Sequence, residues 1–312
     1  MAVVSSSVLR YLFAALKTEF DQAYKRRIEN TIYTKIASVI PTTLPHQDFA
    51  QLGNLPGMRQ WIGQREDNGF GTLFPTYTIS VLKWEDSLDL SRVAIEDDQT
   101  GDVMQRAQDL GIEPIVHKEQ LVVQALAAGA SNYGIDPNNY FFSTNHTESG
   151  TAQSNTTTSF PLTGANLATA LGTMWSYVDN QGRPMYIMPD TLVVGPLNKV
   201  NADQIVHSTL VVSGNTSQTY GLGNKNPLEN IANVLVSPWF TGAYANYWAL
   251  LDTSRPLRPI ILLERSDVPI EFTTRFNPDD PSVYENDTYK MGLRGRYAVG
   301  YGLWQTAFLG QD

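Results

Sequence analysis

The sequence predicts a mixed α+β fold, and three patterns along the chain support this prediction. Apolar residues at helical spacing run through residues 9–24, near the start of the chain. A second helical pattern covers residues 102–128, although Gly111 and Pro114 interrupt it. The last quarter is β-rich, with apolar residues at odd positions from Tyr289 to Leu303. Because short strands at the two ends of the chain cannot form separate cores, we expect them to pair with each other.

The first pattern predicts an amphipathic helix near the N-terminus. Ser5–Ser7 precede it as candidate caps, and Lys25–Arg27 suit the negatively polarised end of a helix. This helix either packs on the core of its own chain or extends as an arm onto a neighbouring subunit. The residues alone slightly favour packing on its own core.

Residues 38–75 are predicted to be irregular, because prolines and glycines recur through them. Tyr77–Val81 then alternates with a period of two, as does a second short segment at Leu88–Leu90, so both are predicted strands. Together they indicate a long two-stranded excursion with a glycine-rich tip at Asn68–Gly71. Such a hairpin gains little stability by itself, so it needs a surface to lie on.

The rest of the chain alternates polar segments with short elements. Residues 141–162 and 213–227 lack periodicity and are predicted to be exposed loops. In the last strand segment Lys290, Arg294 and Arg296 occupy even positions, which gives it one apolar face and one basic face. Helices are expected at 165–178 and 200–206, and strands at 185–188, 192–194, 234–236, 247–251, 259–263 and 271–275.

Composition excludes several classes of protein. The chain has 312 residues, 42% of them hydrophobic, and a formal net charge of -9, which disfavours a protein that reads nucleic acid. It has no cysteine, which excludes disulfides, thiolate catalysis and cysteine-ligated metal sites. No segment reaches the ~18 apolar residues of a membrane-spanning helix, so we predict no membrane association.

The sequence contains none of the common catalytic motifs that we searched for. Phosphate-loop, dinucleotide-binding, nucleophile-elbow and zinc-protease patterns are not found, and the histidines are scattered singly. The acidic clusters Glu96–Asp98, Asp279–Asp280 and Glu285–Asp287 suit helix caps or solvated loops better than acid–base or calcium chemistry. We therefore predict no catalytic, cofactor-binding or metal-ligating residue, and keep an enzyme built on the acidic loops as a competing hypothesis.

Several segments, in order from residue 50 to the C-terminus, carry a resemblance. The first are Leu52-Gly53-Asn-Leu-Pro56-Gly-Met-Arg59-Gln-Trp61-Ile-Gly63, Val93-Ala-Ile-Glu96-Asp97-Asp98, and Tyr140-Phe141-Phe142 followed by Asn145-His146. The best are Trp248-Ala-Leu-Leu-Asp252-Thr-Ser-Arg255-Pro256-Leu-Arg-Pro259-Ile, with Glu264-Arg265 after it, and Tyr289-Lys-Met-Gly292-Leu-Arg294-Gly-Arg296-Tyr-Ala-Val-Gly300-Tyr-Gly-Leu-Trp304-Gln305. This ordered set resembles the Mu-like phage major head protein family (the gpT type), and residues 150–245 match that family less clearly.

The resemblance implies a Hong Kong 97-type phage capsid fold. Residues 1–50 would form an N-terminal arm, and residues 51–92 an extended loop that lies on a neighbouring subunit. Residues 93–160 and 246–312 would form the peripheral domain with its spine helix. Residues 161–245 would form the axial domain, which faces the centre of the capsomer.

The resemblance also implies a function. The protein would be the major capsid protein, assembling with copies of itself into hexamers and pentamers of an icosahedral shell. The shell would enclose double-stranded DNA without sequence-specific binding, with scaffold, portal and possible decoration proteins as further partners. It would be assembled in the host bacterial cytoplasm and end in the virion. An encapsulin-like nanocompartment shell or, less readily, a tail component would account for the same features.

Five residues are predicted to lie at subunit interfaces. Trp61, flanked by Arg59 and Arg65, is the expected anchor, because aromatic and arginine side chains dominate interface hot spots. Arg294 and Arg296 are expected to pair with acidic residues across strands or subunits. Core packing of Trp61 and a solvated basic face at Arg294 and Arg296 are the competing interpretations.

Overall fold

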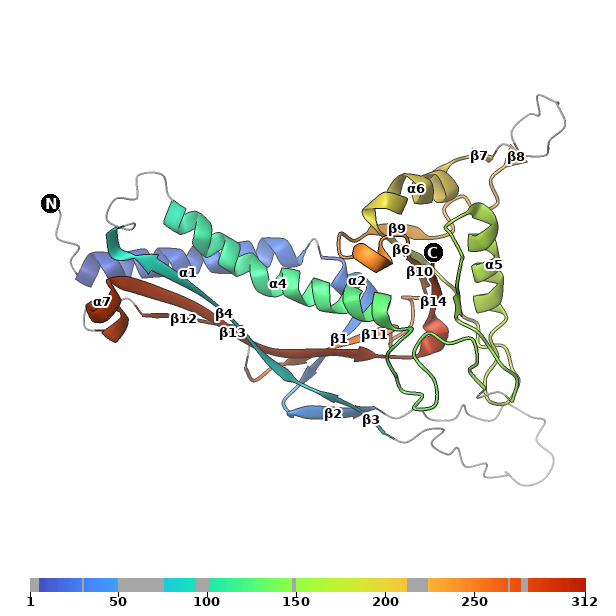
Figure 1. The fold of residues 1–312 in the computed structure, drawn as a ribbon, viewed down its shortest axis with the longest axis horizontal. Helices are drawn as coiled ribbons and strands as arrows, with labels where there is room; N and C mark the ends of the chain where they lie inside the picture. Colours follow the sequence, from blue (N-terminus) through green and yellow to red (C-terminus); the bar gives the residue numbers. More distant parts are fainter. Residues whose placement is uncertain are drawn as a thin grey trace, which may run out of the picture.

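The computed structural model of the protein describes residues 6–29, 31–49, 76–93, 102–147, 150–211, 224–268, 270–275 and 280–312. Figure 1 shows an elongated molecule, with a long arm of helices and strands at one end and a second, more compact body at the other. The described part of the chain begins at the tip of the arm and ends in the compact body.

The arm pairs two long helices with a sheet. Helix α1 (Ser6–Ile28) lies along α4 (Asp102–Ala128), and both run parallel to the length of the sheet (Figure 1). In this sheet β13 (Thr288–Tyr301) pairs along one edge with β4 (Leu82–Ser91). Along its other edge it pairs first with β12 (Glu271–Arg275) and then with β11 (Ile260–Arg265), beyond which lies β1 (Ala37–Thr42).

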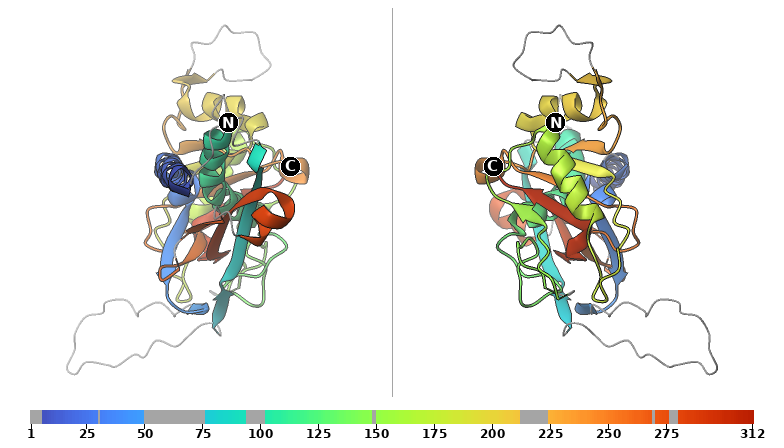
Figure 2. Two further views of the ribbon diagram at one scale, coloured as in Figure 1. Left: turned by 90° about the vertical axis from the view of Figure 1, so that its left-hand side faces the viewer. Right: turned by 90° about the vertical axis from the view of Figure 1, so that its right-hand side faces the viewer.

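The compact body contains a second sheet. Its strand order is β5 (Thr156–Thr157), β14 (Ala307–Gly310), β10 (Trp248–Leu251), β6 (Thr191–Val194) and β9 (Asn233–Val236). Helix α5 (Gly164–Trp175) packs against β14, and α6 (Lys199–His207), which follows the 3-10 turn η1 (Pro196–Asn198), packs against β9. Figure 2 shows α5 facing the viewer from one end of the molecule and α6 across the top.

The remaining elements are short. They are α2 (Tyr33–Ile36), β2 (His46–Phe49), β3 (Tyr77–Ser80), β7 (Leu210–Val211), β8 (Asn224–Lys225), η2 (Gly242–Tyr244), α7 (Pro281–Asn286) and η3 (Trp304–Thr306). No helix among the described residues is both long enough and apolar enough to cross a membrane.

The N-terminal helix packs on its own chain, as its amphipathic pattern slightly favoured. Leu16 and Phe20 are buried against the first half of α4 and against β13. A Cβ atom at Gly111 of α4 would lie 2.8 Å from the carbonyl oxygen of Phe20, so glycine permits the two helices to approach closely.

The pairing of early strands with late strands is confirmed. Strand β1 runs parallel to β11, and β4 runs antiparallel to β13 over ten residue pairs, from Thr288 opposite Ser91 to Tyr297 opposite Leu82. The odd positions of β13 are largely buried, as the alternation predicted. The pair β2–β3 brackets residues 50–76, whereas Leu88 and Leu90 belong to the long arm sheet and not to the excursion.

Four local predictions need correction. The helix at 102–128 is continuous through Pro114, because its buried face, including Ile115, holds it on the core. Residues 37–42 and 46–49 are strands; Pro41 is tolerated because β1 lies at the edge of its sheet. Residues 185–188 are not a strand, since Tyr186 has a left-handed backbone with φ of 52°. The loop 141–162 is not wholly exposed, because it carries buried His146 and Asn155.

Candidate assembly surfaces

The basic side of β13 lies between acidic neighbours. Lys290 Nζ is 3.2 Å from Asp89 Oδ2 on β4. Arg294 is exposed, and its cross-strand neighbours are Glu85 on β4 and Glu271 on β12. Opposite charges at facing positions stabilise a sheet, typically by a few tenths of a kcal/mol to about 1 kcal/mol each.

Arg296 has a different environment. Its facing neighbour is Lys83, and like charges at facing positions are unfavourable. The pKa of the nearby Asp267 carboxyl is lowered, chiefly by its hydrogen bond from Arg265 and to a smaller extent by the charge of Arg296. Arg296 is thus half-exposed, with Lys83 opposite it and the Asp267 carboxylate nearby.

A largely buried cluster of polar side chains holds α4 on the arm sheet. The Lys118 ammonium is 2.5 Å from Glu264 Oε1, and its side chain is only 1% exposed, against 28% for Glu264. The same ammonium lies 5.2 Å from the centre of the Tyr297 ring. At the preceding helix position, His117 Nδ1 is 2.7 Å from the Tyr297 hydroxyl, and burial lowers the pKa of His117. These contacts fix the helix on β11 and β13.

A second cluster of polar side chains joins the arm to the compact body. Arg258 donates to the carbonyl oxygens of Thr34 and Ala37, near the start of β1, and to that of Thr253, just after β10. Asp252, 1% exposed, accepts from the backbone N–H of Met188 at 3.1 Å and lies 3.4 Å from Arg255 Nε. The segment from 252 to 258 therefore sets the two sheets relative to each other.

A third cluster of polar side chains lies inside the compact body. The His146 ring stacks on Trp304 with centroids 3.9 Å apart, and its Nε2 is 3.2 Å from Asn155 Oδ1. Asn155 Nδ2 donates to the carbonyl oxygens of Phe141 and Trp304. Burial lowers the pKa of His146, while Asp136 opposes that shift. These bonds hold the loop after α4 on the end of β13.

The described residues offer little for catalysis. No group of three or more His, Asp or Glu side chains among them could hold a metal ion. A pocket of about 280 Å³ lies between α4 and β13, and its lining includes Asp86, Glu113 and His117. The His117 ring is also engaged there by its edge contact with Trp84, so it is held as a packing residue.

Comparison with known proteins assigns the chain. The family described as Mu-like prophage major head subunit gpT matches residues 9–161, 150–240 and 229–312. The chain belongs to the Mu-like gpT major head family. It is thus a capsid component of the virion and a structural protein, and not an enzyme.

Individual relatives agree with this assignment. The chain is 27% identical over 308 residues to the Mu-like prophage FluMu major head subunit of Haemophilus influenzae, covering 98% of this chain and 74% of that protein. It is 23% identical over 300 residues to the major capsid protein of Escherichia phage Mu, covering 94% and 71% respectively.

Solved structures give the same fold. The procapsid of bacteriophage JBD30 is similar with a TM-score of 0.53 and 26% identity, over 97% of this chain and 75% of that one. The mature capsid of bacteriophage PhiM1 is similar with a TM-score of 0.56 and 13% identity, over 90% and 87%. The expected Hong Kong 97-type capsid fold of this gpT-family subunit is confirmed.

The predicted interface residues of the gpT-family chain fall in two places. Arg59, Trp61 and Arg65 lie outside the described residues. Arg294 and Arg296 lie two residues apart on the same side of β13, one exposed and one half-exposed. Their pairing across subunits stays a prediction.

Sequence reasoning missed the junction at Asp252, Arg255 and Arg258. These residues stand inside the segment that carries the best resemblance, between Trp248 and Ile260. Two arginines and an aspartate between two apolar strand segments could have pointed to a buried polar junction, because charges so close to a core need partners.

Proposed function

We propose that this head subunit assembles into hexamers and pentamers that close into an icosahedral shell around double-stranded DNA. The observation that carries the proposal is the elongated arm, from whose edge the pair β2–β3 leads into residues 50–75. Elongated subunits can bury surface against several neighbours, which a compact monomer of the same size cannot do. The net charge of -9 is consistent with a wall that encloses DNA without reading its sequence.

We assign the parts of the chain to this role as follows. Residues 1–50 form the N-terminal arm of the capsid fold, which is only one portion of the long arm described above. Residues 51–92 form the extended loop, 93–160 and 246–312 the peripheral domain, and 161–245 the axial domain. The second sheet also takes in β5, β10 and β14. We therefore include these strands in the axial body and leave the arm sheet and α4 as the peripheral one.

The interface residues fit the same scheme. Trp61, with Arg59 and Arg65, anchors the extended loop on a neighbouring subunit. Arg294 and Arg296 meet acidic groups of another copy, which is supported by the exposure of Arg294 and by the unfavourable Lys83 neighbour of Arg296. Heterologous contacts of this kind close by rotation into rings.

Other head proteins complete the assembly. We propose a scaffold, a portal and a decoration protein as partners. A decoration protein is supported by the JBD30 capsid, which is described as decorated with minor capsid protein trimers and resembles this chain with a TM-score of 0.54 and 21% identity.

The proposal is tested by expressing the chain with the neighbouring head genes of its own phage and imaging the product by negative-stain electron microscopy. Closed shells are expected, with sixfold and fivefold capsomers in two-dimensional averages. A subunit that stays monomeric under these conditions contradicts the proposal. Open rings or stacked tubes that never close would favour a tail component.

An encapsulin-like nanocompartment is the second candidate, because the virus-like particle from Pyrococcus furiosus has a similar fold, with a TM-score of 0.53 at 8% identity. Particles purified from phage-infected cells separate the two. Packaged double-stranded DNA that survives nuclease treatment supports a phage head, whereas DNA-free particles that contain an enzyme support a nanocompartment.

A further inference from the structure

Two groups of large apolar side chains are exposed on the compact body. The first comprises Tyr186, Met188 and Trp175, with 81%, 61% and 49% of their surface exposed. The second comprises Leu197 and Val200, with 72% and 67% exposed. Isolated apolar side chains on a surface are ordinary, but groups of them indicate an interaction site.

The first group is held in place by hydrogen bonds from its own chain. Tyr186 has a left-handed backbone with φ of 52°, which costs a non-glycine residue of order 1 kcal/mol or more. Arg255 donates to the carbonyl oxygens of Met185 and Tyr186, and Asp252 accepts the Met188 N–H. The fold thus fixes a strained segment while its two largest side chains stay in solvent. A monomer gains nothing from this arrangement, whereas a partner gains a contact that is already ordered.

The first group lies near the end of α5. The backbone N–H of Met185 donates to the carbonyl oxygen of Tyr177 at 2.9 Å, which brings Tyr186 beside the end of α5, where Trp175 lies. Helix α5 has no charged residue along its whole length. Helix α5 therefore adds no charge beside the group.

The second group lies at the other end of β6. Residues 185–190 lead into β6, and Leu197 and Val200 follow it in η1 and α6. The helices of the two groups also pack on different strands of the sheet, α5 on β14 and α6 on β9. Two distinct apolar surfaces on different sides of one body are what a head-to-tail contact requires.

The charges beside both groups are paired within the chain. Lys199 pairs with Asp203 on α6, and Arg183 pairs with Asp179 at 2.9 Å in the turn after α5. Because the chain carries a net charge of -9, copies repel one another on average, and they approach most easily where the local charge is neutral. This property makes a second copy of the chain the fitting occupant for both groups.

We propose that Tyr186 and Met188 of one copy, together with Trp175, pack against Leu197 and Val200 of the next copy, and that this contact, the seam, repeats around each capsomer ring. The seam rests on the proposed function, because it presupposes capsomers. It goes beyond that function by naming which side chains meet.

Cysteine crosslinking tests the seam directly, because the natural chain has no cysteine. Shells made from the double variant Tyr186→Cys/Val200→Cys are treated with an oxidant, and in parallel with a short bismaleimide. A non-reducing denaturing gel is expected to show a ladder of covalent multimers that ends at the ring, and reductant should collapse the oxidised ladder. Shells that form normally but yield only monomer with both reagents overturn the seam.

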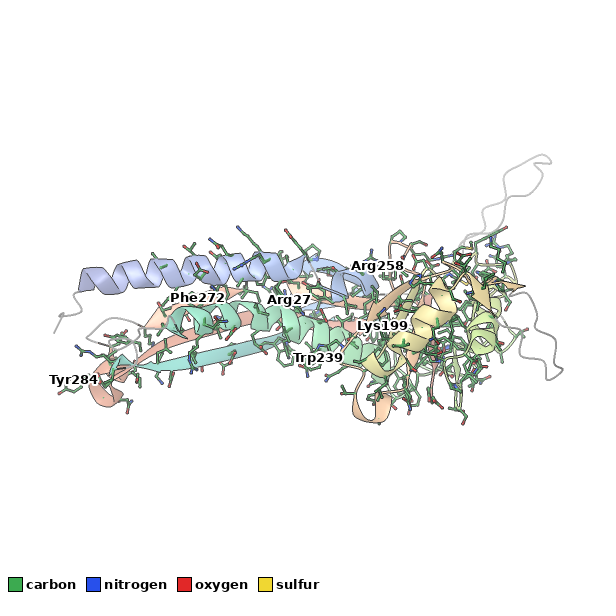
Figure 3. All side chains as sticks on the ribbon, turned by 90° about the horizontal axis from the view of Figure 1, so that it is seen from above. Arg27, Lys199, Trp239, Arg258, Phe272 and Tyr284 are labelled. Atoms are coloured by element: carbon green, nitrogen blue, oxygen red, sulfur yellow. The ribbon has the colours of Figure 1, made fainter. Side chains whose placement is uncertain are left out.

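Matched controls separate the seam from chance collisions. Tyr284→Cys/Val200→Cys places the first cysteine on α7, at the far end of the arm (Figure 3), on a residue 89% exposed, and should remain monomeric. Each single variant should also remain monomeric. Dimers from Tyr186→Cys alone would mean that like surfaces meet, and would overturn the head-to-tail arrangement.

A charge exchange covers the case in which the cysteine pair does not assemble. Tyr186→Lys and Val200→Glu should each lower the yield of shells by about tenfold or more, and their combination should recover it. Normal circular dichroism and melting of the soluble subunits would show that each variant folds. Failure of the combination to recover shells would refute the seam, whereas an unchanged natural chain that forms no shells would refute the proposed function instead.

Discussion

Removing the charge of Glu264 should weaken the subunit strongly, because its partner Lys118 would remain in the core. In the natural chain the Lys118 ammonium is 1% exposed and lies 2.5 Å from the Glu264 carboxylate. In Glu264→Gln the same ammonium would face a neutral amide. Breaking a buried ion pair from one side costs about 3–5 kcal/mol. Glu264 is 28% exposed, so water can replace part of the lost attraction, and we expect about 2–4 kcal/mol.

The assay is urea unfolding of the soluble, unassembled subunit, with a double-mutant cycle. Lys118→Met should cost less, because the Glu264 carboxylate left behind is 28% exposed and can be solvated, and Lys118→Met/Glu264→Gln should cost less than the sum of the two. Lys290→Met is the matched control, since Lys290 and Asp89 are 44% and 53% exposed and such a pair contributes about 1 kcal/mol at most. A cost of Glu264→Gln no larger than that of Lys290→Met, or additive costs in the cycle, would refute the reasoning.

Three further predictions concern pH, helix packing and assembly. Burial lowers the pKa of His117 below its ordinary 6.5, so the folded state binds fewer protons than the unfolded state. The stability of the subunit should therefore fall as the pH drops below about 6.5. The unfolding midpoint of His117→Gln should fall less over the same pH range. Gly111→Ala should destabilise the subunit by about 1–3 kcal/mol despite the better helix propensity of alanine, because of the 2.8 Å approach to Phe20; Gly172→Ala, where a Cβ meets nothing within 4 Å, should raise the melting temperature instead. Trp61→Ala should give a folded, soluble subunit that assembles poorly, and normal particles in electron microscopy would contradict its role as an anchor.

Much of the fold could be predicted because its elements follow simple periodicities. The alternation along β13 and the helical spacing in α1 and α4 each come from one face meeting one core. The pairing of early with late strands followed from their shortness alone. These features depend on local pattern, which a sequence displays directly.

The errors arose where tertiary contacts outweigh local preference. Pro114 and Gly111 suggested a break, but burial on both sides of Pro114 keeps α4 continuous. The apolar run at 185–188 has the composition of a strand, yet Arg255 and Asp252 hold its backbone in another conformation. Those two residues lie more than sixty positions away in the chain, so no window of sequence reports their effect.

The assembly surfaces were the hardest part to predict. Arg294 and Arg296 were proposed as interface residues because they occupy even positions on a strand whose odd positions are apolar. Tyr186, Met188, Leu197 and Val200 look like core residues in the sequence, because apolar side chains are usually buried. Only their exposure in the fold shows that they are not core residues and makes them candidates for a subunit contact.

The long strand β13 has a mechanical consequence for a shell. It begins beside α7 at the tip of the arm, pairs with β4, β12 and β11 on the way, and leads through η3 into β14 of the compact body. A pull on the arm tip is therefore transmitted to the compact body along one covalent backbone, with hydrogen bonds on both edges sharing the shear. A load applied between the arm tip and the compact body is therefore carried by a continuous strand, so the subunit resists extension in that direction.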